Sequence, residues 1–328
     1  MTTNRMEKFL YGILCLALCG LCIGGCNGGE NTHSIVSERE SSILENSSLS
    51  MPETSEEGKI SYVSGIELGE YFTSITNGNE VYISGIVTLK TTDAMHGTFI
   101  GESNQGDILI SGGEAYAVVE ATGLGVGAIK AQEGSTLVFQ NLTIRDTSLA
   151  GRTSEDRREG YLEFGGKLRF ENCVFECAAY LCDDADAEFV NCAFDSGAEN
   201  MYAVWISDGS ASFTDCTFTG WRAIKLYEGS DNKYTSMQPH FDVVSVIVDG
   251  CLFDNLKKKP GLAIDVFAGK ETSVTIKNSH FNGCQGGDGV DCIDGAYESD
   301  VDTATLTFSM ENVLVNGNSC AWETDRKH

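Results

Sequence analysis

The stretch Leu168-Arg169-Phe170-Glu171-Asn172-Cys173-Val174-Phe175 decides the fold, because its side chains alternate in character on both sides of a corner. Leu168 and Phe170 face one way and Arg169 the other, as successive side chains of a strand do. The Glu171-Asn172 pair predicts a tight corner, since Asn tolerates left-handed backbone geometry. The alternation then resumes with Cys173 and Phe175. The stretch therefore predicts two short strands that turn one apolar set toward a shared core.

The same pattern recurs at intervals of 19 to 35 residues, which is typical of stacked solenoid coils. The other copies are Leu137–Ile144, Phe189–Phe194, Phe213–Phe218, Val248–Phe253, Ile276–Phe281 and a degenerate Met310–Val315. Further short strands are expected upstream of copies, at Ala128–Ala131, Tyr161–Phe164, Val204–Ser207, Ala223–Tyr227 and Ala263–Phe267. Three strands per coil with an Asn corner predict an all-β fold, a right-handed parallel β-helix over residues 80–318.

These repeats, their Asn corners and their inward stacks resemble the pectin-lyase-like β-helix superfamily, and also the shorter repeats of bacterial polymorphic surface proteins. The resemblance covers roughly residues 80–318. It implies a sugar-binding groove on the face formed by the first strand of each coil. It implies no particular reaction, because one fold supports many functions.

The first 26 residues predict export and lipid attachment. Arg5 and Lys8 precede an apolar run at residues 9–23, which is short for a membrane span and typical of a secretory signal. The run ends in Ile23-Gly24-Gly25-Cys26, which resembles the bacterial lipobox. We therefore expect a signal peptide at 1–25 and lipid on Cys26, which would hold the protein on a membrane, facing outside the cytoplasm. The alternatives are an ordinary signal peptide and an uncleaved anchor.

The remaining segments follow from composition and apolar spacing. Residues 26–58 are rich in Ser, Glu, Asn and Gly, which predicts a disordered tether. Apolar residues from Tyr62 to Thr76 recur at three- and four-residue spacing, which predicts a short helix within an N-terminal cap at 59–79. Such a helix would cover the open end of the strands. Val81–Leu89 reads as a strand, and 319–328 as a C-terminal tail.

The chain is strongly acidic, with 22 basic and 48 acidic side chains and a formal net charge of −26. Removal of residues 1–25 leaves 20 basic and 47 acidic side chains, a charge of −27. Such a surface repels phosphate backbones and has no basic stripe, which argues against nucleic-acid binding. It also repels anionic lipid, so the acyl chains must supply the membrane attachment.

Nine cysteines follow Cys26, and four of them share one repeat position. These four are Cys173, Cys192, Cys216 and Cys251. At that position we expect a column of reduced, buried thiols that pack as small apolar groups. A disulfide between neighbouring coils is the alternative. The sequence gives no pairing for the others, Cys177, Cys182, Cys284, Cys292 and Cys320.

One row of outward side chains is the predicted ligand site. If the aliphatic residues of the first strands point inward, their neighbours form a row of Lys130, Glu163, Trp205, Lys225 with Tyr227, and Asp265. An exposed Trp or Tyr offers a flat surface for a sugar ring, and carboxylates could hold a hydroxyl or a calcium ion. The alternative is the ordinary mixture of polar and aromatic residues found on such faces.

A catalytic reading of this row is the competing hypothesis. Arg222-Ala223-Ile224-Lys225 resembles the basic motif of polygalacturonases, and Asp183-Asp184 their paired-aspartate motif. An uncharged Lys225 could abstract the proton beside a uronate carboxylate, whereas paired carboxylates suit inverting hydrolysis. The candidate catalytic residues are Lys225, Asp265, Asp183 and Asp184. The Gly-His-Gly and Asn-Thr-Asp motifs of polygalacturonases and the pectate-lyase Arg-x-Pro-x-x-Arg motif are missing.

An acidic segment offers oxygen ligands suited to calcium. Asp291 and Asp294 are its candidate ligands, with Asp288, Glu298, Asp300 and Asp302 nearby. Their spacing departs from that of an EF-hand loop, and a solvated acidic loop is the alternative.

The function that these patterns favour is ligand binding at the cell envelope. The expected partner is a polysaccharide or another cell-surface protein. A polysaccharide lyase or glycoside hydrolase acting on uronate-containing polysaccharide is the first alternative, and a structural spacer is the second.

Overall fold

The computed structural model describes fourteen segments of the chain: residues 59–62, 80–90, 98–100, 106–113, 117–122, 128–146, 161–196, 201–206, 209–226, 243–257, 262–267, 271–282, 293–298 and 305–316. All regular elements in these segments are strands. None of the segments contains a helix with the length and apolar character needed to cross a membrane.

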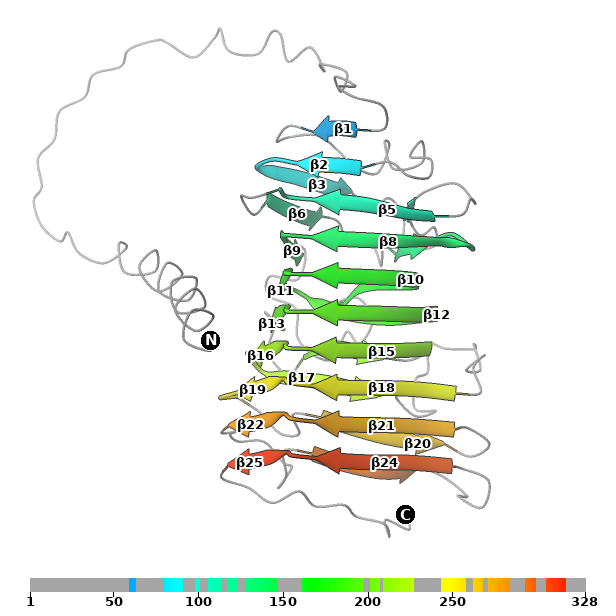
Figure 1. Ribbon diagram of the computed structural model, residues 1–328, viewed down its shortest axis with the longest axis vertical. Coiled ribbons are helices and arrows are strands. Elements are labelled where there is room, and N and C mark those ends of the chain that lie inside the picture. Colours follow the sequence, from blue (N-terminus) through cyan, green and yellow to red (C-terminus); the bar gives the residue numbers. More distant parts are fainter. Residues whose placement is uncertain are drawn as a thin grey trace, which may run out of the picture. The chain divides into compact units, whose positions relative to one another are not determined.

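The strands stack in parallel into three faces, which we call the long, short and third faces (Figure 1). The long face contains β1 (Lys59–Tyr62), β2 (Glu80–Ile83), β5 (Gly106–Ser111), β8 (Ser135–Gln140), β15 (Gly209–Thr214), β18 (Val243–Asp249), β21 (Glu271–Lys277) and β24 (Thr305–Glu311). The short face contains β3 (Ile86–Lys90), β6 (Ala117–Thr122), β9 (Leu142–Asp146), β11 (Val174–Glu176), β13 (Ala193–Asp195), β16 (Thr217–Thr219), β19 (Leu252–Asp254), β22 (His280–Asn282) and β25 (Leu314–Asn316).

The third face contains β4 (Thr98–Ile100), β7 (Ala128–Ala131), β14 (Tyr202–Ile206), β17 (Arg222–Leu226), β20 (Leu262–Phe267) and β23 (Ile293–Glu298). Two strands, β10 (Tyr161–Glu171) and β12 (Ala178–Val190), run through the third face and continue into the long face. The predicted three-strand coil is therefore confirmed, and the arrangement is consistent with a parallel β-helix.

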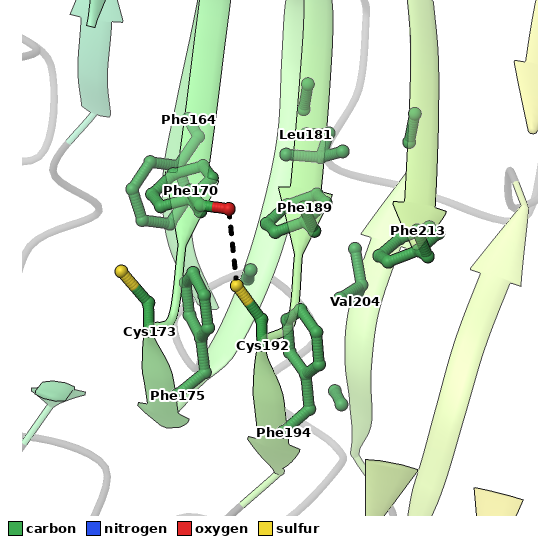
Figure 2. Packing of buried hydrophobic residues seen from close by; sticks show 14 of the residues in the cluster. Phe164, Phe170, Cys173, Phe175, Leu181, Phe189, Cys192, Phe194, Val204 and Phe213 are labelled. Carbon is green, nitrogen blue, oxygen red and sulfur yellow. Dashed lines mark hydrogen bonds between the residues drawn. The ribbon is translucent and has the colours of Figure 1, made fainter. Parts of the chain in front are cut away.

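Columns of phenylalanine fill the core between the faces (Figure 2). On the long face, Phe139, Phe170, Phe189 and Phe213 stack with centroids 4.9–5.0 Å apart and nearly parallel rings. A second column on the short face comprises Phe175, Phe194, Phe218, Phe253 and Phe281, at 4.1–4.8 Å. The two columns meet edge to face, as in the Phe189–Phe194 pair at 5.4 Å. The strand spacing of about 4.8 Å sets this stacking distance. Coils beyond the columns place an aliphatic side chain at the same position, as Ile110 does beside Phe139 and Val248 beside Phe213.

The corner between the long and short faces adopts the predicted left-handed backbone. Its residues have φ between 49° and 67° and are Asn141, Asn172, Asn191, Asp215, Gly250, Asn278 and Asn312. Their side chains also connect coils, since Asn191 Nδ2 donates to Asn172 Oδ1 at 2.7 Å and Asn172 Nδ2 to Asn141 Oδ1 at 3.2 Å. The corner residues thus turn the chain, and their side-chain amides form hydrogen bonds from one coil to the next.

The predicted thiol column is confirmed. Cys173, Cys192, Cys216 and Cys251 are free and at most 2 % exposed. Each thiol reaches a phenylalanine carbonyl of the preceding coil, as Cys192 Sγ donates to Phe170 O at 3.4 Å (Figure 2). Burial raises the pKa of Cys192. The pKa of Cys251 is also raised, mainly by its hydrogen bond with Cys216 and to a smaller extent by burial. Burial also acts to raise the pKa of Cys216 between them, but its hydrogen bonds with Cys192 and Cys251 lower that pKa overall. These thiols are packing groups that also satisfy corner carbonyls.

Some expectations about strand positions need correction. Val81–Leu89 is not one strand, because Ser84-Gly85 makes a corner with φ 70° at Gly85 and separates β2 from β3. Lys59–Tyr62, expected at the start of the cap, forms a strand that pairs in parallel with β2. The rest of the predicted cap helix, Cys26, the signal peptide, the tether and the tail 319–328 lie outside the described residues.

Candidate functional site

The predicted outward row lies on the third face. Strand pairing aligns Tyr180 with Trp205, and Trp205 with Lys225, on β12, β14 and β17. The same row includes Ala128 and Glu163 before Tyr180 and continues through the backbone positions of Ala263 and Asp294. Its members alternate with residues that are buried in the main core, namely Leu162, Phe164, Leu181, Val204, Ile206, Ile224 and Leu226. Alternation along each strand therefore directs the row away from the core, as predicted.

The aromatic members of the row are covered. Trp205 is 4 % exposed and Tyr180 6 %, and their rings meet edge to face with centroids 5.0 Å apart. With Ala178 and Met201 they form a small apolar cluster outside the main core. The expectation of an exposed Trp205 ring is therefore wrong: large aromatic side chains on adjacent strands bury each other's surface even on an outward face. Trp205 is a supporting side chain and not an open platform for a sugar.

Two cations lie over the aromatic rings of β14, Tyr202 and Trp205. Lys225 Nζ is 5.3 Å from the Trp205 ring centroid and 5.8 Å from that of Tyr202. Arg222 Cζ is 5.1 Å from the Tyr202 centroid, and Arg222 Nη1 donates to the Tyr202 hydroxyl at 3.1 Å. Such contacts stabilise a cation by about 0.5–2 kcal/mol, more where water is excluded. We call Tyr180, Tyr202, Trp205, Arg222 and Lys225 the cation–aromatic cluster.

The electrostatics of the cluster are unusual for this chain. Within the described residues, Arg145 pairs with Glu120 at 3.1 Å and Arg169 with Glu171 at 2.7 Å, but no carboxylate pairs with Arg222. The Nε of Arg222 is buried and has no hydrogen-bond acceptor among the described residues. Arg222 and Lys225 are both half-buried, so each remains partly open to solvent. A planar guanidinium with unused donors matches the two oxygens of a carboxylate or sulfate.

The other predicted site residues are placed less completely. Asp265 lies on β20 opposite Ala296, one outward position beyond the row of Lys225, and Lys130 lies on β7 opposite Gly165. Asp183 and Asp184 fall in β12 where its pairing with β10 shifts register between Gly165 and Lys167. The side chains of Asp183, Asp184, Asp265 and Asp294 lie outside the described residues, as do Tyr227 and Asp291 entirely.

No metal centre is formed by the side chains that the structure describes. Among them, no group of three or more His, Cys, Asp or Glu residues could hold a metal ion. The predicted calcium ligands Asp291 and Asp294 are not among these side chains, and calcium binding there stays a prediction.

Three members of the cluster were not predicted from the sequence to belong to the ligand site. They are Tyr180, Tyr202 and Arg222. Tyr180 lies on the third-face part of β12, a strand that the repeat pattern did not identify upstream of the Phe189 copy. Tyr202 and Arg222 lie opposite each other at the first residues of β14 and β17, where the alternation is disturbed and consecutive residues such as Ala223 and Ile224 are both buried. The sequence does contain one indication of Tyr180. Tyr180-Leu181 repeats the aromatic-then-aliphatic order of Trp205-Ile206, which would have placed Tyr180 in the outward row.

Comparison of the chain with models of protein families, with curated proteins and with solved structures found no match.

Proposed function

We propose that this chain is a lipoprotein of the cell envelope, built on a right-handed parallel β-helix of the pectin-lyase-like kind, that binds an acidic glycan at the cation–aromatic cluster. The lipobox-like Ile23-Gly24-Gly25-Cys26 supports the anchor, and the repeats support the fold. The observation that carries the binding proposal is the pair Arg222 and Lys225, held over the Tyr202 ring without a carboxylate partner for Arg222 in the described part of the chain.

The cluster suits recognition of an anionic group for three physical reasons. The buried rings of Tyr180, Trp205 and Tyr202 form a rigid floor, so the cations lose little conformational freedom on binding. A partly desolvated cation interacts more strongly with an anion than a fully hydrated one does. Arg222 can bind two oxygens at once, while Lys225 supplies a point charge beside it.

The net charge makes this site necessary for any acidic ligand. At −26 the protein repels a polyanion, and this repulsion acts over a Debye length of about 8 Å at physiological salt. An acidic glycan therefore gains nothing from non-specific attraction and depends on local cations. The loss of one cation of the cluster should accordingly be measurable as a loss of affinity.

We expect Arg222→Ala to weaken binding of polygalacturonate at least about tenfold, because a hydrogen bond to a charged group contributes about 1.5–3 kcal/mol. Isothermal titration calorimetry on the full chain measures this directly. Lys167→Ala is the matched control, since it removes one positive charge from an exposed position of β10 on the long face. If the two variants lose the same affinity, only net charge matters and the proposed site is wrong.

The catalytic alternative is separated by Lys225→Ala. A binding site predicts modestly weaker binding and no new ultraviolet absorbance when wild-type protein is incubated with polygalacturonate. A lyase predicts absorbance from unsaturated products, lost by orders of magnitude in Lys225→Ala. Appearance of such products would replace the binding proposal by the enzymatic one.

A further inference from the structure

A further cation lies over an aromatic ring at the edge of the third face. Lys257 Nζ is 5.3 Å from the centroid of the Trp221 ring, at a distance typical of a cation–π contact. Trp221 is half-buried, whereas Lys257 is exposed. No carboxylate among the described residues forms an ion pair with Lys257. Its charge is therefore open to an anion from solvent. We call these two residues the Trp221–Lys257 pair.

The backbone holds this pair at the turn from the short face to the third face. Trp221 directly precedes Arg222, the first residue of β17, and its N–H donates to the hydroxyl of the buried Ser196 at 3.3 Å. Lys257 follows β19 in the next coil, and its N–H donates to Gly220 O at 2.9 Å. Each residue of the pair is thus tied by a backbone hydrogen bond to the coil before it.

The pair lies close to the cation–aromatic cluster without being part of it. Gly220 is two residues before Arg222, and two residues of chain span at most about 7 Å. With the 2.9 Å hydrogen bond to Gly220 O, the backbones of Lys257 and Arg222 lie within about 10 Å of each other. The two cations lie over different rings, Arg222 over Tyr202 and Lys257 over Trp221. They are therefore two separate positions for negative charge, one on each of two consecutive coils.

The sequence concentrates positive charge at the same place. Lys257-Lys258-Lys259 is the longest run of basic residues in a chain whose formal net charge is −26. The acidic residues nearest to this run in the sequence are Asp254 and Asp265. Asp254 Oδ1 accepts hydrogen bonds from Asn255 Nδ2 at 2.9 Å and Asn282 Nδ2 at 2.8 Å, so this carboxylate is engaged by amides. The run thus departs from the acidic composition of the chain where it adjoins the proposed glycan site.

We infer that the Trp221–Lys257 pair is a second subsite for the acidic glycan, and that the ligand is a polymer with acidic groups on successive sugars; this rests on the proposed function. A single acidic sugar can neutralise the cations of the cluster but gains nothing from Lys257. In a polymer the second contact is intramolecular, and linked contacts raise affinity by about 10²–10⁴ over one contact alone. Two cationic positions also offset the repulsion that the rest of the chain exerts on a polyanion.

The test compares galacturonate with tetragalacturonate on the full chain, by tryptophan fluorescence for the monosaccharide and by calorimetry for the tetramer. Wild-type protein should bind the tetramer at least about 100-fold more tightly. Lys257→Ala should bind the tetramer at least about tenfold more weakly, the usual loss of a contact to a charged group, and the monosaccharide like wild type. Lys257→Arg keeps the cation and should retain the tetramer. Lys167→Ala is the matched control, because it removes an exposed lysine from the long face.

Equal losses of tetramer affinity in Lys257→Ala and Lys167→Ala would overturn the second subsite, and so would a loss of monosaccharide affinity in Lys257→Ala. Either result leaves the proposed function standing if Arg222→Ala weakens binding of both ligands. If Arg222→Ala weakens neither, the proposed function fails and the second subsite with it. A DNA oligonucleotide of the same charge that binds more tightly than the tetramer, and more weakly to Lys257→Ala, would assign the pair to nucleic acid instead.

Discussion

Phe189→Ala is expected to lower the free energy of unfolding by about 3–5 kcal/mol, the usual cost of truncating a fully buried Phe. Phe189 stacks on Phe170 and Phe213, both at 4.9 Å, and meets Phe194 edge to face at 5.4 Å. It therefore has neighbours in the coil before, the coil after and the opposite column. The surrounding rings are fixed by strand spacing and cannot collapse into the space, so most of the cavity would remain. Urea denaturation followed by circular dichroism measures the change.

Phe308→Ala is the matched control for this prediction. Phe308 also points toward the core from the long face, but it lies in the last described coil and is only partly buried. We expect a loss of roughly 1 kcal/mol there, because less apolar surface is removed from the core. Equal losses for the two variants would mean that stacking between coils does not determine stability.

The second large effect is expected at Gly209. Its φ is 86°, and an added Cβ would overlap the carbonyl oxygen of Ala185 in the preceding coil. Gly209→Ala should therefore cost about 1–2 kcal/mol for the left-handed backbone and about 1–3 kcal/mol more for the displaced strand. The same denaturation experiment reports the sum as a free energy of unfolding.

Gly113→Ala separates the two contributions. Gly113 has φ 68°, but nothing lies within 4 Å of the Cβ that would be added. It should lose only the backbone part, about 1–2 kcal/mol. A Gly113→Ala variant as unstable as Gly209→Ala would show that close contact between coils at Gly209 contributes nothing.

The core could be predicted from the sequence because one pattern is repeated in many coils. Phe170, Phe189 and Phe213 occupy the same place relative to a left-handed corner, so alternation within one copy fixes the facing of all of them. The thiol column follows in the same way, since Cys173, Cys192 and Cys216 each lie three residues after a core Phe, and Cys251 lies three residues after the core residue Val248. Where the pattern is absent the prediction fails: the Gly85 corner between β2 and β3 has no Asn-Cys motif, and no motif marked the third-face part of β12 as a strand.

The cation–aromatic cluster could be predicted only in part. The two-residue period of a strand correctly predicts that Trp205 and Lys225 point outward, and the repeat correctly predicts that they are neighbours on adjacent strands. It says nothing of whether an outward ring is covered, because that depends on side chains from other strands. Tyr180 comes from the preceding coil, and Tyr202 and Arg222 come from strand ends where the alternation is disturbed. A covered Trp205 ring beneath Lys225 is therefore a property of three coils together.

The most direct test of the proposed function compares two forms of one polymer. Polygalacturonate and its fully methyl-esterified form share the same sugar backbone and differ in carboxylate charge. Calorimetric titration of wild-type protein should show at least tenfold weaker binding of the ester. In the double variant Arg222→Ala/Lys225→Ala this difference should vanish, because the side chains that bind the carboxylate have been removed. Equal affinity of wild-type protein for the two polymers, or an unchanged difference in the double variant, would contradict recognition of an acidic glycan by this cluster.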